Sequence, residues 1–322
     1  PYPNDPDDPT KPGTPTETVP NVPGYTPMVP TDPTKPVNPN TNPLKPLVPV
    51  EPEHPEKGYK VPPVPTTPGQ DTPITYVADP QKVLVKVVKV EGEGEKKTET
   101  PLPKDNVTID GQTGENIPND KVIEKITELE NRGYVIDNRD EVLNYINTQF
   151  DKEKDSTDRD PSQTVTLKVH EKVVEVTEPK TPNDPVDPTK PEGPTWPTEG
   201  LKESNLKVEV TRTITYVKKE TPEGNEEPSG IENKVDKVLF KRTAMYNLVR
   251  KTVTYGDWIV STDETHLSTS FSTVKTPVLT GYIADHKQVE AQDAPKPTET
   301  GEVTNIEKKV VYTKLGSWIP KV

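Results

Sequence analysis

The chain has 322 residues, of which 28% are hydrophobic and 41 are proline, and its net charge is −13. A chain this polar cannot bury enough apolar surface to offset the entropy of ordering one large core. Its apolar residues must therefore be concentrated in part of its length. The acidic balance argues against nucleic acid and anionic membrane surfaces as partners, because Lys and Arg supply most of the affinity for both.

Three further absences in the sequence narrow the class of protein. No cysteine is present, which excludes disulfides and thiolate metal sites. No run of about 18 apolar residues occurs, so no membrane-spanning helix or membrane insertion is predicted. The first residues show no charged-then-apolar signal pattern, so we expect any export signal to lie outside this sequence.

Prolines recur at every third position in much of residues 1–75, and this spacing matches the three residues per turn of polyproline II. The phrase Asp-Pro-Thr-Lys-Pro occurs at 8–12, at 32–36 and again at 187–191. We therefore predict an extended proline-rich spacer over 1–75 and a proline-rich linker over 179–200. A PxxP ligand is the alternative, but every proline tract of period three contains that pattern.

Residues 76–178 carry the patterns of a first folded domain. Val83, Val85 and Val87 alternate with polar residues, as in a half-buried strand, and the glycine-rich 91–94 predicts a turn after them. The predicted elements in chain order are a strand over 83–90, a helix over 119–133 that buries Val122, Ile123, Ile126 and Leu129, a second helix that includes Val142, Leu143, Ile146 and Phe150, and a strand over 164–176.

Residues 201–322 carry the patterns of a second folded domain. The segment 206–217 predicts a strand whose buried face holds Leu206, Val208, Val210, Ile214 and Tyr216. Arg212 is the only charged residue on that face. Further strands are predicted within 237–246, 250–258 and 305–315, with a turn at 222–225 and an irregular connection at 268–277.

The two domains share a short motif. Gly-Tyr-Val-Ile-Asp stands at 133–137 and Gly-Tyr-Ile-Ala-Asp at 281–285, each followed by a polar stretch and a closing strand. Coincidence is the alternative to a duplication. We interpret the domains as divergent copies of one small α+β, β-rich unit.

No arrangement of residues typical of an enzyme is found, and we predict that the chain is not one. Its histidines, His54, His170, His266 and His286, show no HExxH spacing, and His170 lies on the outward face of its predicted strand. A Gly-x-Ser-x-Gly elbow and a phosphate-binding loop are also missing.

An acidic cluster at 151–160 is the one candidate metal site, for Ca²⁺, and no other cofactor is predicted. Four aspartates there could offer oxygens to the ion: Asp151, Asp155, Asp158 and Asp160. Lys and Arg are interleaved with them, and Ser156 stands where an EF-hand loop has glycine. A solvated loop is therefore the favoured interpretation.

Three aromatic residues are candidates for ligand binding, because an aromatic ring can stack on the C–H groups of a sugar face. They are Trp196, Tyr255 and Trp258. Core packing is the favoured role for Trp258, and also for Trp318. Trp196 lies in the proline-rich linker, where both roles stay open.

Several phrases resemble the Mub repeats of mucus-binding adhesins from Gram-positive gut bacteria. They are DTPITYVADPQK (71–82), TVTYGDW (252–258), VKTPVLTGYIAD (274–285) and VVYTKLGSWIP (310–320). The resemblance implies two tandem ubiquitin-like β-grasp domains, B1 over 76–178 and B2 over 201–322, separated by extended proline-rich spacers like beads on a string. It also implies one monomeric repeat of a longer tandem array on the bacterial cell surface or cell wall, with signal peptide and anchor outside this sequence.

The resemblance further implies weak, multivalent binding to host mucin glycans, including sialylated ones. Some repeats of this family also bind immunoglobulins, so a protein-binding module that uses an exposed sheet edge is the alternative, and a passive stalk is another. No sugar-contact motif can be transferred to this chain. The segments 141–150 and 229–251 depart from the family pattern.

Overall fold

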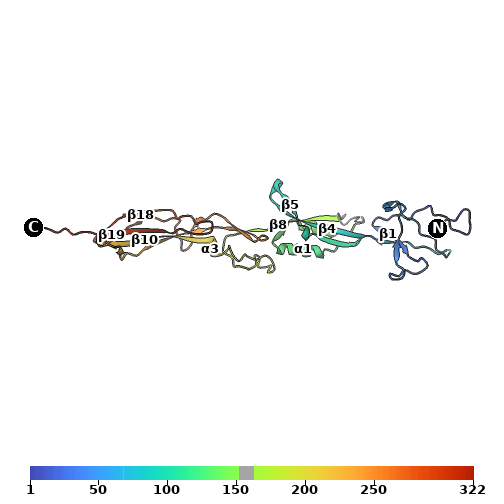
Figure 1. Ribbon diagram of the computed structural model, residues 1–322, viewed down its shortest axis with the longest axis horizontal. Coiled ribbons are helices and arrows are strands. Elements are labelled where there is room, and N and C mark those ends of the chain that lie inside the picture. Colours follow the sequence, from blue (N-terminus) through green and yellow to red (C-terminus); the bar gives the residue numbers. More distant parts are fainter. Residues whose placement is uncertain (68, 152–162) are drawn as a thin grey trace. The chain divides into compact units, whose positions relative to one another are not determined.

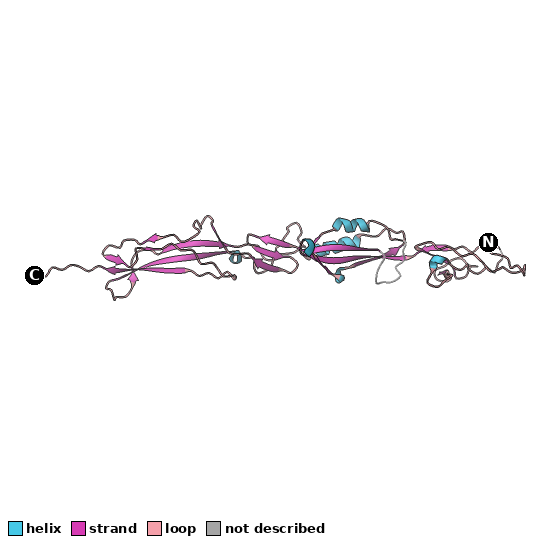
Figure 2. Cartoon of the chain, turned by 90° about the horizontal axis from the view of Figure 1, so that it is seen from above, coloured by secondary structure: helices cyan, strands magenta, loops and turns pink. Residues whose placement is uncertain are grey.

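The computed structural model describes residues 1–67, 69–151 and 163–322 (Figure 1). These residues form two compact units. Unit 1 comprises residues 1–130 and 135–170, and unit 2 comprises residues 131–134 and 171–322. Within the described residues, strands predominate, and the two longer helices both belong chiefly to unit 1 (Figure 2).

The first 78 residues of unit 1 fold around a small sheet. Its strand order is β2 (Leu44–Pro46), β1 (Tyr25–Pro30) and β3 (Thr75–Ala78), with both pairs antiparallel. A one-turn 3₁₀ helix, η1 (Pro55–Lys57), lies between β2 and β3. The core consists of the buried residues Val19, Val29, Leu47 and Tyr59. Val19 and Tyr59 exchange backbone hydrogen bonds of 2.9 Å, which fixes two distant proline-rich segments side by side.

The repeated phrase Asp-Pro-Thr-Lys-Pro forms the same turn in all three copies. In the first copy, Oδ1 of Asp8 accepts hydrogen bonds from the backbone N–H of Thr10 at 3.0 Å and from its hydroxyl at 2.6 Å. The same pair of bonds, at 2.6 to 3.0 Å, runs from Thr34 to Asp32 and from Thr189 to Asp187. The threonine hydroxyl bond holds the pKa of each of these aspartates below its ordinary value.

The expectation of continuous extended polyproline over 1–75 and 179–200 is therefore wrong. Proline fixes φ, but it suits the second position of a β-turn as well as polyproline II, and a preceding Asp can cap that turn. The turns reverse the chain, as the antiparallel bridges Asn4–Pro12 and Pro185–Thr195 show. Period-three spacing alone does not distinguish a strut from a series of capped turns.

The second part of unit 1 contains a mixed sheet. Its order is β5 (Thr98–Pro101), β4 (Pro80–Glu91), β8 (Gln163–Glu171) and β7 (Tyr134–Ile136), and β6 (Val107–Gln112) also pairs with β4. The central strands β4 and β8 are parallel, with Val85 opposite Val165. The helices α1 (Asp120–Asn131) and α2 (Arg139–Ile146) and the short η2 (Gly94–Lys96) and η3 (Pro103–Asp105) lie in the connections.

The sequence patterns account for most of this second part. Val83, Val85 and Val87 of β4 are buried, as predicted, and so are Val122, Ile126 and Leu129 of α1. Ile123, predicted to be buried, is exposed, because it lies beside the apolar stripe of α1. Gly133 follows α1 with φ of 100°, a conformation that favours glycine. The single strand predicted over 164–176 is two strands, β8 and β9 (Val173–Val176).

Gly111→Ala is expected to lower the free energy of unfolding of unit 1 by about 1–3 kcal/mol, because overpacking of a dense core is costly. A Cβ at Gly111 would lie 2.2 Å from Cε2 of Phe150, whose ring is buried just beyond α2. Amide hydrogen exchange of α2 in the full chain measures the effect. Gly316→Ala, which meets no atom within 4 Å and has no positive φ, is the control. Equal protection in both variants would contradict the prediction.

Unit 2 is built around a second mixed sheet. Its order is β15 (Ile259–Ser261), β12 (Lys234–Lys241), β10 (Lys207–Lys219), β19 (Ile306–Lys314) and β17 (Tyr282–Ala284), and β11 (Glu227–Pro228) also pairs with β10. β10 and β19 are parallel, with Tyr216 opposite Val310. Their connection holds strands and loops, including the pair β16 (Val274–Lys275) and β18 (Gln288–Val289).

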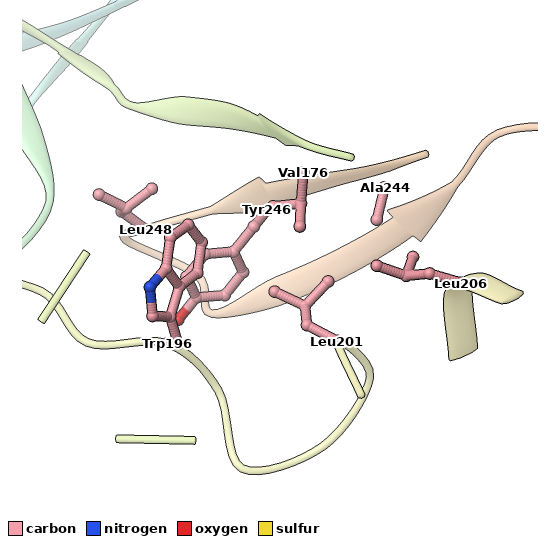
Figure 3. Packing of buried hydrophobic residues seen from close by; sticks show 7 residues of the cluster. All are labelled: Val176, Trp196, Leu201, Leu206, Ala244, Tyr246 and Leu248. Atoms are coloured by element: carbon pink, nitrogen blue, oxygen red, sulfur yellow. The ribbon is translucent and has the colours of Figure 1, made fainter. Parts of the chain in front are cut away.

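A smaller antiparallel sheet of unit 2 has the order β14 (Thr252–Tyr255), β13 (Ala244–Asn247) and β9. The segment predicted as a linker, 179–200, packs on it through Trp196, and the short helix α3 (Glu203–Leu206) follows (Figure 3). This segment is thus part of the folded unit.

The motif shared by the two domains makes the same contacts in both. The carbonyl of Gly133 accepts a hydrogen bond from the N–H of Lys172 at 3.0 Å, and that of Gly281 accepts one from Leu315 at 2.8 Å. Four residues after each glycine, the N–H of an aspartate donates to the closing strand, from Asp137 to Lys168 at 2.8 Å and from Asp285 to Val311 at 2.9 Å. Identical spacing and bonding agree with a duplicated unit.

Candidate functional site

All three aromatic ligand candidates belong to unit 2, but they do not form one site. Trp196 lies in a core cluster with Val176, Leu201, Leu206, Ala244, Tyr246 and Leu248 (Figure 3). Its ring centroid is 5.8 Å from that of Tyr246, and Nζ of Lys180 lies 5.1 Å from its ring. Only 9% of Trp196 is exposed, so the structure places this residue in packing.

Tyr255 and Trp258 lie together around the buried side chain of Arg242. Cζ of Arg242 is 3.6 Å from the ring centroid of Tyr255 and 4.1 Å from that of Trp258. Nε of Arg242 donates to the carbonyl of Asn205 at 2.7 Å, and Nη1 donates to that of Glu299 at 2.6 Å. We call these three residues the Arg242 clamp. Burial lowers the pKa of Arg242, and the facing rings offset part of this desolvation by cation–π attraction.

The polar atoms of both rings in the Arg242 clamp donate hydrogen bonds to backbone carbonyls. Nε1 of Trp258 donates to the carbonyl of Thr298 at 2.9 Å, and the hydroxyl of Tyr255 donates to that of Gly200 at 2.8 Å. Trp258 is only 5% exposed, whereas Tyr255 is 37% exposed. Tyr255 is therefore the one candidate of the three with substantial ring surface open to solvent. The sequence patterns did not single out Arg242, which lies just after a strand with nothing to mark it as buried.

A second polar arrangement, the His266 clasp, joins the loop after β15 to the outer face of β10. Nε2 of His266 lies 2.6 Å from Oε2 of Glu209, and Nδ1 lies 2.8 Å from Oδ1 of Asp263. The bond to Glu209 raises the pKa of His266, and the same bond lowers the pKa of Glu209. Lys237 also pairs with Glu209, at 3.5 Å. In the sequence, this histidine is one of four that are scattered along the chain.

The His266 clasp is expected to be strongest between about pH 4.5 and 6.5. A raised histidine pKa means that its contribution is complete below the ordinary value of 6.5 and is lost as pH rises through the folded pKa. The lowered carboxylate pKa means that Glu209 contributes above 4.5, and this is lost as pH falls through its folded pKa.

An NMR titration of the His266 ring in the full chain tests this prediction. The pKa should lie above 6.5, and Glu209→Gln should shift it downward. Glu226→Gln is a matched control, because that carboxylate of unit 2 pairs with Lys309 instead. Titration of His266 at or below 6.5 in the unsubstituted chain would contradict the assignment.

The candidate Ca²⁺ site falls mainly outside the described residues, since Asp155, Asp158 and Asp160 lie within 152–162. The N–H of Asp151 donates to Oε1 of Gln163 at 2.9 Å. Over the described ranges, no group of three or more His, Asp or Glu side chains is placed to hold a metal ion. His170 is half-buried as a residue, with 45% of its side chain exposed, and its Nδ1 lies 2.5 Å from Oδ1 of Asp137.

Part of the chain matches a known protein family, and several solved structures are similar to it. Residues 201–316 match the family model of the Muc B2-like domain. A crystal structure of Mub-RV is 20% identical, with 73% of this chain and 100% of that chain covered and a TM-score of 0.43. The type 2 repeat of the mucus binding protein MUB from Lactobacillus reuteri is 21% identical over 73% and 99% of the chains, with a TM-score of 0.37.

The MucBP domain of an adhesion protein from Pediococcus pentosaceus is 30% identical, over 33% of this chain and 98% of that one, with a TM-score of 0.27. None of the curated proteins compared with the chain matches it. No helix in the described parts is long and apolar enough to cross a membrane.

The described residues are β-rich with few helices, and the match to the Muc B2-like domain places the chain in the class of mucus-binding domains. The match over 201–316 and the phrases that resemble Mub repeats identify it more closely. The chain belongs to the family of Mub-type mucus-binding repeats.

Proposed function

We propose that the chain is an adhesin repeat that binds mucin glycans by weak contacts multiplied over many copies. The observation that carries this proposal is the match of residues 201–316 to the Muc B2-like domain. Such a repeat acts outside the cell on a bacterial surface, with host mucins as partners, including sialylated ones.

We also propose that the two domains predicted over 76–178 and 201–322 are tandem β-grasp domains, the first without residues 171–178, because their strand β9 pairs with β13 in unit 2. Each has a central parallel strand pair, β4 with β8 and β10 with β19, and each carries the Gly-Tyr motif in the same bonding register. In the first, α1 lies in the crossover between the parallel strands. In the second, strands and loops take its place.

Net charge bears on how such a repeat recognises mucin. Sialylated or sulfated mucin and this chain, at −13, are both anionic, so overall charge attraction cannot drive adhesion. Ring stacking and hydrogen bonds at a local surface must do so. Tyr255 is our candidate contact, because its ring is partly exposed and its orientation is fixed by Arg242 and by Gly200.

The experiment measures binding of the chain, displayed as a tetramer, to a mucin surface before and after enzymatic removal of O-glycans. Binding should be lost with the glycans. Tyr255→Ala should weaken it by roughly five- to tenfold, whereas Tyr255→Phe, which keeps the ring, should retain most of it. Tyr282→Ala is the matched control, since this tyrosine also has a cation–π partner and a bonded hydroxyl. Equal binding to mucin without glycans would overturn the proposal.

An immunoglobulin-binding role through a sheet edge is the second candidate, and the strand lengths do not favour it. The edge strands of the unit 2 central sheet, β15 and β17, have three residues each. A peptide added to so short an edge gains few main-chain hydrogen bonds. Binding to immunoglobulin that survives deglycosylation of the target would support this role instead.

A further inference from the structure

A groove of about 750 Å³ lies in the first 78 residues of unit 1. Its lining is mixed: one part holds Tyr2, Val61, Ile74, Tyr76 and several prolines, and the rest holds polar residues such as Thr16, Gln70 and Thr72. Two tyrosines are fixed in place, since the hydroxyl of Tyr2 donates to Pro62 O at 3.1 Å and that of Tyr76 donates to Pro20 O at 2.6 Å. We call this the proline–tyrosine groove.

The charged side chains that line the proline–tyrosine groove are all negative. Its lining includes the carboxylates of Glu17 and Asp71, and none of the lining side chains is Lys, Arg or His. Both carboxylates are exposed, and neither makes an ion pair with a described residue. An apolar segment that carries a cation would therefore complement the groove in both polarity and charge.

The chain itself contains such a segment at residues 315–322, which form no helix or strand. Trp318 is 89% exposed and Ile319 is 76% exposed, whereas Trp196 and Trp258 are buried. Lys321 is the only charged side chain of the segment. Together these two side chains present apolar surface that a partner would remove from water.

We propose that residues 315–322 of one copy dock in the proline–tyrosine groove of a second copy. Trp318 and Ile319 pack on the apolar wall, and Pro320 lies against the tyrosines, as proline segments do in aromatic grooves. Lys321 pairs with Glu17 and Asp71. Because the two surfaces differ, the contact is heterologous and joins copies head to tail. In the array proposed above, the second copy would be a neighbouring repeat.

The test uses the full chain and follows its mass by sedimentation between about 10 µM and 1 mM, a range suited to a small interface. The weight-average mass should rise with concentration. Acrylamide quenching of tryptophan fluorescence should fall in parallel, since Trp318 is the exposed tryptophan. Trp318→Ala should lower the association constant at least tenfold, and Leu267→Ala, an exposed apolar control elsewhere in unit 2, should leave it unchanged.

Charge reversal separates the proposed contact from nonspecific association. Lys321→Glu should weaken association, as should the pair Glu17→Lys and Asp71→Lys, and mixing the two variants should restore it. A mass that stays monomeric to 1 mM would overturn the proposal, as would association unaffected by Trp318→Ala or quenching that does not change with concentration. Mucin binding by tetrameric Trp318→Ala should persist, so failure here is distinguishable from failure of the proposed function.

Discussion

Arg212→Ala is expected to lower the free energy of unfolding of unit 2 by about 3 kcal/mol, the lower part of the range for breaking a buried ion pair. The side chain is fully buried on the core face of β10, where its neighbours along the strand are apolar. It donates to the carbonyl of Ser272 at 2.6 Å, to that of Glu290 at 3.1 Å and to Asp236 at 3.0 Å. Its guanidinium also lies 5.1 Å from the ring of Phe271.

Arg212 therefore ties the loops that carry Ser272 and Glu290 to the central sheet. Alanine would leave both carbonyls without this donor and create a cavity, whereas Asp236, partly exposed, can be hydrated. Nε of Arg212 already has no hydrogen-bond partner among the described residues, which keeps the expected loss moderate.

Amide hydrogen exchange of β10 and β19 in the full chain measures the effect of Arg212→Ala, because a single unfolding curve is not defined for two units. Lys234→Ala is the matched control. It removes an exposed partner of Asp236, 3.6 Å away, and should change the free energy of unfolding by less than about 1 kcal/mol. A loss below that value in Arg212→Ala would contradict the structural role.

Arg242→Ala is expected to lower the free energy of unfolding of unit 2 by about 2–3 kcal/mol, the sum of two hydrogen bonds to carbonyls and the stacking in the Arg242 clamp. Arg242→Lys should recover little of this, because an ammonium cannot stack flat between two rings and donate along two fixed directions.

Fluorescence of Trp258 provides the readout for the Arg242 clamp. Its emission should shift to longer wavelength in both variants as water reaches the ring, and hydrogen exchange of β12 should accelerate. Lys241→Ala, one residue earlier, is the positional control and should change neither. Full stability of Arg242→Lys would show that the stacked geometry contributes little.

The central strands of the two larger sheets and the two longer helices could be predicted from side-chain periodicity. Val83, Val85 and Val87 mark the buried face of β4, and the spacing of Val122, Ile126 and Leu129 marks that of α1. Each of these elements buries one face, and the spacing of apolar residues that marks this face can be read from a short stretch of sequence. The same local reasoning placed Arg212 on the core face, but its partners come from residues 24 to 78 positions away.

The proline-rich segments could not be predicted by the same means. Period three in proline is shared by a polyproline strut and by turns, and the difference lies in the side-chain bonds of Asp8, Asp32 and Asp187 to threonine. The core that joins Val19 to Tyr59 depends on how those turns return the chain. The role of Trp196 was open for a similar reason, since its partner Tyr246 is distant in sequence.

The candidate site was predicted only in part. Tyr255 was singled out as an aromatic residue able to stack on a sugar, and in the structure this residue is 37% exposed. The arginine that orients it was missed, because local sequence shows no sign that Arg242 meets the segment of Tyr255 and Trp258. The groove lined by Tyr2 and Tyr76 was missed because it needs the proline-rich segments to fold.

Binding of the monomeric chain and of its tetramer to the same glycosylated mucin surface tests the central claim most directly. Weak sites used in multiple copies predict that the tetramer binds about 10²–10⁴ times more tightly than the monomer, with no new contact. The gain should disappear on mucin stripped of its O-glycans. Equal apparent affinity of monomer and tetramer, or a gain that survives removal of the glycans, would contradict the account.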